Sequence, residues 1–260
     1  GVKAGAGFST ALMILILGGI LSIIVFGISS SESNLGNVLD FSTTDGSTVS
    51  FNAVFTAMLA AFWAYQGWAS TGYIGGEIKN VNRTLPKSIA IGVFIVIALY
   101  LLVNTAYLSL LPVENLEQIS QAGNKIAAIE AVTVFGGSTG ALLISALICI
   151  TTLGCTNATI LVSSRPYYAM AKEGMFFSSV ARLNKEQVPS NSLLYQCVWA
   201  CLLIFSGTFD QLTDMIIFAV FIYYGATTLG VFILRKKMPD APRPYKVWGY
   251  PVVPAIIILF

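Results

Sequence analysis

Residues 65–76 combine polar, aromatic and glycine residues inside an otherwise apolar stretch, residues 51–76. Gly67, Gly72, Gly75 and Gly76 weaken a helix, and Gln66, Ser70 and Thr71 supply hydrogen-bonding groups. A helix that unwinds inside a membrane offers free N–H and C=O groups to a charged ligand, and lipid tolerates such backbone only where it is buried or lines a cavity. The segment therefore predicts a binding site at a break near Gly67. Gly72-x-x-x-Gly76 also fits a close helix contact, and both interpretations can hold together.

A second polar group follows in a later apolar stretch, where Cys155, Thr156 and Asn157 are consecutive. Their thiol, hydroxyl and amide could contribute to a cation site or to a ligand pocket. The alternative is a helix-packing contact of the kind that small polar residues make in membranes. The sequence contains no histidine, which excludes histidine-dependent catalysis and zinc sites of the HExxH type. We expect no cofactor and no metal site.

The composition identifies the solvent around these groups as lipid. Hydrophobic residues make up 56% of the chain and charged residues only 10%, whereas soluble domains carry about 25% charged residues. The apolar runs are continuous rather than alternating, which favours helices over a β-barrel. A membrane-embedded enzyme would need a nucleophile with a base, or a metal cluster, and the sequence offers neither. We therefore predict an all-α, polytopic membrane bundle that is not an enzyme.

Seven stretches are candidates to cross a hydrocarbon core that needs about 20 apolar residues of helix. They are residues 8–28, 51–76, 88–111, 139–162, 192–206, 212–234 and 250–260. The last is only half a span and the chain begins without Met. We expect a single transmembrane domain, residues 1–260, that is a fragment of a larger protein.

The loops between these stretches carry very different charges. The N-terminal edge and loops 77–87, 163–191 and 235–249 hold every one of the fourteen Lys and Arg residues except Lys125. The opposite loops hold acidic residues, namely Glu32, Asp40, Asp45, Glu114, Glu117, Glu130, Asp210 and Asp214. Positively charged loops mark the cytoplasmic face, so loops 77–87, 163–191 and 235–249 are predicted to be cytoplasmic.

Four motifs, in order along the chain, resemble one transporter family. They are Phe62-Trp-Ala-Tyr-Gln-Gly-Trp68 with Glu77-x-Lys-Asn-x-x-Arg-Thr-Leu-Pro86, then Gly154-Cys-Thr-Asn-Ala-Thr159, Tyr168-Ala-Met-Ala-Lys-Glu-Gly174 and Leu234-Arg-Lys-Lys-Met-Pro239. Together they resemble the amino acid–polyamine–organocation (APC) superfamily of permeases, most closely its L-type amino-acid transporter branch. The motifs extend over nearly the whole chain.

The resemblance implies a twelve-helix parent with two inverted five-helix repeats, of which this chain would hold about helices five to eleven. It implies secondary active transport of amino acids across the plasma membrane by alternating access, as a symporter or an antiporter. By the same resemblance, Trp63, Ala64 and Tyr65 would offer backbone carbonyls to the substrate, and the Trp63 ring would form an outer lid. Gln66 and Gly67 would form the unwound turn, and Trp68 would shape the pocket.

The chain departs from this family at one position. L-type transporters resemble one another in a lysine within helix five, but the matching position here is apolar, near Ile16. Exchange, Na⁺ symport and H⁺ symport therefore all stay open. The alternatives to amino-acid transport are a polyamine or organic-cation permease, which would need buried acidic residues that we do not expect in the spans, and a non-transporting accessory membrane subunit. We expect an amino-acid substrate and a lipid bilayer as partners and no nucleic acid, and the sequence identifies no protein partner.

Overall fold

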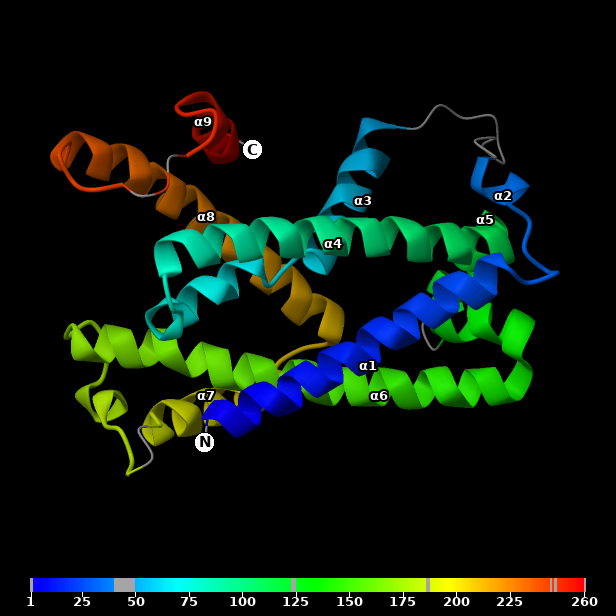
Figure 1. Cartoon of the computed structure of the whole chain (residues 1–260), viewed down its shortest axis with the longest axis horizontal. Helices are drawn as coiled ribbons and strands as arrows, with labels where there is room; N and C mark the ends of the chain where they lie inside the picture. Colours follow the sequence, from blue (N-terminus) through cyan, green and yellow to red (C-terminus); the bar gives the residue numbers. More distant parts are fainter. Residues whose placement is uncertain are drawn as a thin grey trace. The chain divides into compact units, whose positions relative to one another are not determined.

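The computed structural model describes residues 2–39, 50–122, 125–185, 188–243, 245 and 247–259. Every regular element in these ranges is a helix, which confirms the all-α prediction (Figure 1). The elements in chain order are α1 (Val2–Ile28), α2 (Gly36–Leu39), α3 (Phe51–Ala64), the 3-10 helix η1 (Trp68–Glu77), α4 (Val81–Leu110), α5 (Val113–Ala122), α6 (Ala127–Lys172), the 3-10 helix η2 (Ser178–Ala181), α7 (Ser190–Ile204), α8 (Phe209–Lys237) and α9 (Val252–Leu259). Asp40, Asp45 and Lys246, three of the residues used to assign loop charge, lie outside the described residues.

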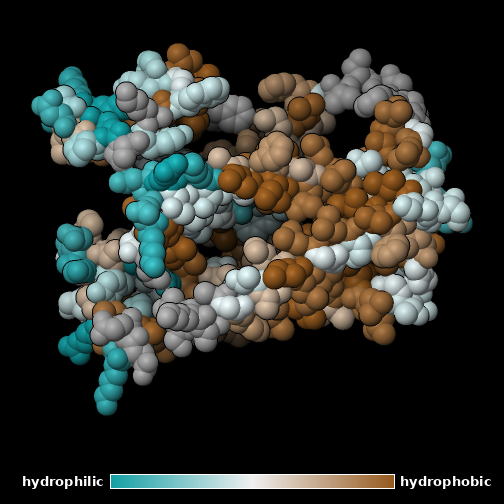
Figure 2. Space-filling view, in the orientation of Figure 1, coloured by the Kyte–Doolittle hydropathy of each residue, from teal (hydrophilic) through white to brown (hydrophobic). Residues whose placement is uncertain are grey.

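Four of the described helices are long and apolar enough to cross a membrane, and this makes the chain a multi-pass membrane protein. The four segments are Gly7–Ile28, Val81–Leu110, Ala127–Lys172 and Gln211–Lys237. Large apolar side chains cover much of the visible helix surface (Figure 2, brown). Helix α7 is apolar but shorter, and α3 and α9 cover only parts of the stretches at 51–76 and 250–260.

The helices form two compact units, each of which is described by itself. The first unit comprises Gly1–Thr48, Gly92–Ser163 and Asn184–Val188. The second unit comprises Val49–Ile91, Ser164–Leu183 and Pro189–Phe260. The residues predicted to form the broken helix lie in the second unit, whereas Cys155, Thr156 and Asn157 lie in the first.

Within the first unit, α1 and α6 approach closely through two glycines. A Cβ atom added to Gly154 would lie 2.9 Å from Leu12 Cδ1, and one added to Gly19 would overlap Leu147 Cδ2. The contact moves backward along α6 as it moves forward along α1, so the two helices pack antiparallel. Small residues let helix backbones approach in lipid, where van der Waals packing drives association.

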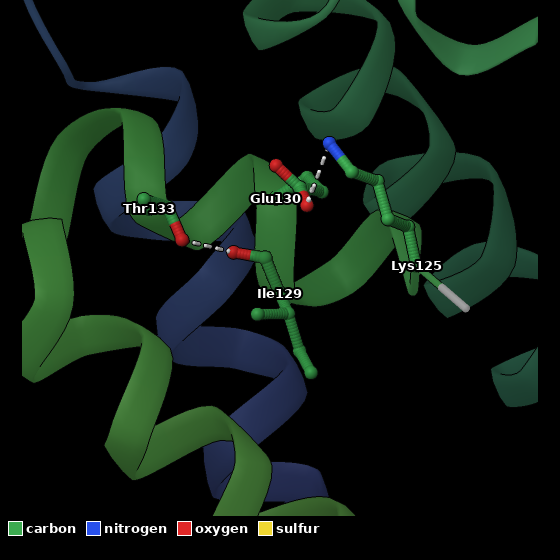
Figure 3. Close-up of polar contacts among 4 residues, drawn as sticks. All are labelled: Lys125, Ile129, Glu130 and Thr133. Carbon is green, nitrogen blue, oxygen red and sulfur yellow. Dashed lines mark hydrogen bonds and ion pairs between the residues drawn. The ribbon is translucent and has the colours of Figure 1, made fainter. Parts of the chain in front are cut away.

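Helix α6 contains a break that the sequence analysis did not predict. At 46 residues it would be about 69 Å long as one straight helix, more than twice the hydrocarbon thickness. The backbone is non-helical at Gly137, where φ is +57°, just before the predicted span at 139–162. The first turns of α6 are stabilised by an ion pair, 3.5 Å from Lys125 Nζ to Glu130 Oε1, and by the Thr133 hydroxyl, which donates to the Ile129 carbonyl (Figure 3).

The assignment of Asp214 to a loop was wrong. Helix α8 begins at Phe209, after a capping box in which Thr208 and Gln211 satisfy each other's backbone N–H groups. This cap starts the helix before the predicted span at 212–234 does, so α8 contains Asp210 as well as Asp214, and both were counted with the loops. Helices α4, α6 and α8 likewise extend into the loops expected at 77–87, 163–191 and 235–249, because charged side chains at helix ends can reach the headgroup region without ending the helix.

Candidate functional site

The break near Gly67 is present in the structure. Helix α3 begins with the Ser50 hydroxyl accepting from the Ala53 N–H and ends at Ala64. A three-residue turn, residues 65–67, follows, and Gly67 has a φ of +114°, a left-handed conformation that glycine adopts far more readily than any other residue. The chain then continues as η1, a tighter helix. The discontinuous helix is therefore confirmed, and its turn coincides with Gln66 and Gly67.

The turn satisfies several of its own backbone groups. The Tyr65 N–H donates to the Ala61 carbonyl and the Gln66 N–H to the Trp63 carbonyl, both over 3.1 Å. The Ser70 N–H donates to the Gly67 carbonyl, also over 3.1 Å. Each of these carbonyls has a second lone pair, so the Trp63 carbonyl can accept a hydrogen bond from a ligand and keep the one from the Gln66 N–H.

Tyr224 on α8 is the residue that the sequence analysis missed. Its hydroxyl donates to Gln66 Oε1 over 3.1 Å, and its ring centroid lies 5.6 Å from that of Trp68. One turn earlier on α8, Phe221 packs edge-on against Phe62 of α3, with ring centroids 5.2 Å apart. Helix α8 therefore contacts α3 before the break and both the turn and η1 after it. The tyrosine pair at 223–224 interrupts the apolar run at 215–226 and marks this part of α8 in the sequence, but it does not identify Gln66 as the partner.

The aromatic residues of the motif differ in their contacts. Trp68 contacts Tyr224, and its role in shaping the substrate pocket stays a prediction. Trp63 is 36% exposed, and its lid role stays a prediction, as do the substrate contacts of Ala64 and Tyr65. The close-packing alternative for Gly72 and Gly76 gains no support from the described residues, because a Cβ atom added to either glycine meets no heavy atom within 4 Å.

The second polar group lies on α6 in the first unit. The Thr156 hydroxyl donates to the Thr152 carbonyl one turn back, over 2.8 Å, and Cys155 is a free, exposed thiol. Gly154, next in sequence, is the close contact with Leu12 of α1. The close helix contact is thus made by Gly154, while Cys155 and Thr156 are exposed, and a role for Cys155, Thr156 and Asn157 in binding a cation or a substrate stays a prediction.

Helix α1 provides no charge where L-type transporters have their lysine. Ile16 is half-buried and lies between Leu12 and Gly19, the residues that contact α6. In the part of the chain that the structure describes, no three His, Cys, Asp or Glu residues are grouped so that they could hold a metal ion.

Comparison of the sequence with known proteins identifies the family. Residues 1–260 match the amino acid permease family over their whole length. The chain is 31% identical to the serine/threonine exchanger SteT of Bacillus subtilis over 99% of its length and 57% of that protein. It is 30% identical to the mouse b(0,+)-type amino acid transporter 1 over 97% of its length and 49% of that protein. It is also 30% identical to the human large neutral amino acids transporter small subunit 2 over 80% of its length and 37% of that protein.

The chain thus spans about half the length of the curated relatives it matches, or less. The family match covers the break at Gly67, its partner Tyr224 and the α1–α6 contact alike. On this evidence, the chain belongs to the amino acid permease family of the APC superfamily.

Proposed function

We propose that this chain contributes half of the substrate site of a secondary active amino-acid transporter that works by alternating access. The observation that carries the proposal is the break at Gly67, between α3 and η1. Discontinuous helices in secondary transporters present free backbone dipoles to the substrate near the middle of the membrane. The names of its relatives, an exchanger of serine and threonine and two amino acid transporters, support the substrate class.

The chemistry around the break favours a zwitterion. Residues 63–76 contain no charged side chain, so an ammonium or carboxylate bound there would be met by backbone groups and by neutral side chains. Those dipoles can satisfy both ends of an α-amino acid, whereas a polyamine has only positive groups and would need carboxylates. Tyr224 and Gln66 bond to each other and support the turn beside this site.

We infer the orientation of the chain in the membrane from the charges of its loops. The protein lies in the plasma membrane with loops 77–87, 163–191 and 235–249 in the cytoplasm, because these loops carry nearly all of the basic residues. The break then separates α3, on the outer side, from η1, on the inner side. The uptake experiment below distinguishes exchange from Na⁺ symport and H⁺ symport.

The test is uptake of a mixture of labelled amino acids by proteoliposomes that contain the full-length protein. Uptake is measured with a Na⁺ gradient, with a proton gradient and with preloaded amino acid. We expect a neutral amino acid to accumulate under one of these conditions. Failure of every amino acid to enter, or to protect the protein from heat, under all three conditions would overturn the amino-acid assignment.

Two matched glycine variants locate the site. A methyl group fits at both Gly67 and Gly72, but only Gly67 has a positive φ. Gly67→Ala therefore strains the broken conformation by about 1–3 kcal/mol and should lower uptake roughly tenfold or more. Gly72→Ala should keep uptake within about twofold of the wild type. Equal uptake by the two variants would contradict a site at the break.

A further inference from the structure

The outer half of α3 and the first turns of α8 line a partly open cavity of about 470 Å³ in the second unit, in which Phe218 and Asp214 are exposed. This volume is within the range of about 300–1,000 Å³ that is typical of small-molecule sites. Four phenyl rings and one carboxylate line it, together with two aliphatic side chains. The rings and the carboxylate belong to Phe55, Phe62, Phe218, Phe221 and Asp214.

The lining follows one face of each helix. On α3 the lining residues are Phe55, Leu59 and Phe62, at intervals of four and three residues. On α8 they run from Asp214 to Phe221, again at intervals of three, one and three. Such spacing aligns side chains on a single helical face. The edge-on contact between Phe62 and Phe221 fixes the two faces against each other.

Asp214 adds a negative charge to this otherwise apolar cavity. It is the one charged residue in the lining, and no ion pair to it is recorded among the described residues. A carboxylate attracts an ammonium group directly, and phenyl rings attract it through their negative faces. An anion would be repelled, and a neutral molecule of the same shape would leave the carboxylate without a counter-ion.

We propose that this cavity binds an amphipathic organic cation, namely an amine with a bulky apolar body. The ammonium group lies at Asp214, and the apolar body lies among the four phenyl rings. The site is separate from the break at Gly67 and goes beyond the proposed transport of amino acids. An α-amino acid suits it poorly, because the substrate carboxylate would face the Asp214 carboxylate.

The experiment uses a fluorescent amine, dansylcadaverine, and its neutral analogue, the dansyl amide of pentylamine. Both are titrated against the full-length protein in lipid nanodiscs, with empty nanodiscs subtracted, and no amino acid is present. We expect the wild type to bind the amine about tenfold more tightly than the neutral analogue. This comparison needs no variant, so it holds even if a substitution impairs folding.

Two pairs of variants then locate the bound amine. Asp214→Asn should weaken amine binding about tenfold and abolish the preference over the neutral analogue, whereas Asp240→Asn, in the exposed loop after α8, should leave both unchanged. Phe218→Ala should weaken both ligands several-fold, and Phe209→Ala, at an exposed position outside the lining, should weaken neither.

Equal binding of the amine and its neutral analogue by the wild type would overturn the proposal. So would an Asp214→Asn protein that binds the amine as tightly as the wild type. Neither measurement involves transport, so failure of this site and failure of amino-acid uptake are seen in different experiments.

Discussion

Tyr224 and Gln66 are 158 residues apart in the sequence, yet they form a side-chain hydrogen bond between α8 and the turn at Gly67. The bond connects the neutral amide of the turn to a helix that also contacts α3 through Phe221 and Phe62. The position of the Gln66 side chain, and with it the shape of the turn, therefore depends on α8. We infer that Tyr224 positions the turn for substrate rather than contacting the substrate itself.

Replacing Tyr224 with Phe removes the hydroxyl and keeps the ring against Trp68. The lost hydrogen bond contributes about 1 kcal/mol, so we expect KM for the transported amino acid to rise roughly fivefold while the maximal rate changes less than twofold. Uptake kinetics in proteoliposomes provide the measurement. A purely structural role would lower the maximal rate through loss of folded protein and leave KM unchanged.

The neighbouring residue offers the control. Tyr223 is also on α8 and is 72% exposed, so Tyr223→Phe should leave KM as in the wild type. Gln66→Ala should raise KM by about the same factor as Tyr224→Phe. The double variant should add little to either single variant, because both remove the same bond. Fully additive effects would show that the two residues act independently.

At the scale of elements, the first unit depends on the close approach of α1 and α6. Gly18 and Gly19 are adjacent on α1, but only Gly19 points at a neighbour: a Cβ atom there would overlap Leu147 Cδ2, whereas one on Gly18 meets nothing within 4 Å. Ile23 and Ile144 continue the contact into a buried cluster with Val132. The packing of these two helices therefore leaves room for a side chain at Gly18 and none at Gly19.

Gly19→Leu should separate the helices and lower the free energy of unfolding by about 1–3 kcal/mol, the usual effect of overpacking. Gly18→Leu, with open space at its position, should change it by less than about 0.5 kcal/mol. Thermal unfolding of the purified protein in detergent, followed by loss of monodisperse protein, gives the comparison. Equal melting temperatures for the two variants would show that the α1–α6 contact does not limit stability.

Some of these elements were predictable from the sequence and others were not. The break at Gly67 could be predicted because several glycines and polar side chains are clustered at membrane depth, where lipid tolerates free backbone groups only beside a cavity or inside protein. The break at Gly137 lies in Gly136-Gly-Ser-Thr-Gly140, a glycine-rich signal of the same kind that the sequence analysis did not use. The contact of Tyr224 with Gln66 depends on how two distant helices pack, which no local pattern encodes. Asp210 was misplaced because a capping box, not the apolar run, determines where α8 begins, whereas Asp214 already lay inside the predicted span at 212–234 and was counted with the loop only for its charge.

At the scale of the whole molecule, the basic residues are distributed very unevenly among the loops. All basic residues but Lys125 fall on the side assigned to the cytoplasm. Lys125 itself pairs with Glu130 at the start of α6, so its charge is partly neutralised locally. One basic residue on the outer side therefore does not weaken the assignment.

The orientation can be measured by cysteine labelling at the two ends of α6. Lys125 precedes α6 and Lys172 ends it, and both side chains are exposed. In a cysteine-free background expressed in intact cells, a membrane-impermeant maleimide should label Lys125→Cys directly and Lys172→Cys only after the membrane is permeabilised. Loss of the exposed Lys125–Glu130 pair should cost no more than about 1 kcal/mol, which leaves the protein folded for the assay.

Labelling of both positions from the same side would mean that α6 re-enters the membrane at Gly137 instead of crossing it, and the alternation of all later spans would shift by one. Labelling of Lys125→Cys from outside and of Lys172→Cys only after permeabilisation would agree with a turn at Gly67 that lies between an outer α3 and an inner η1.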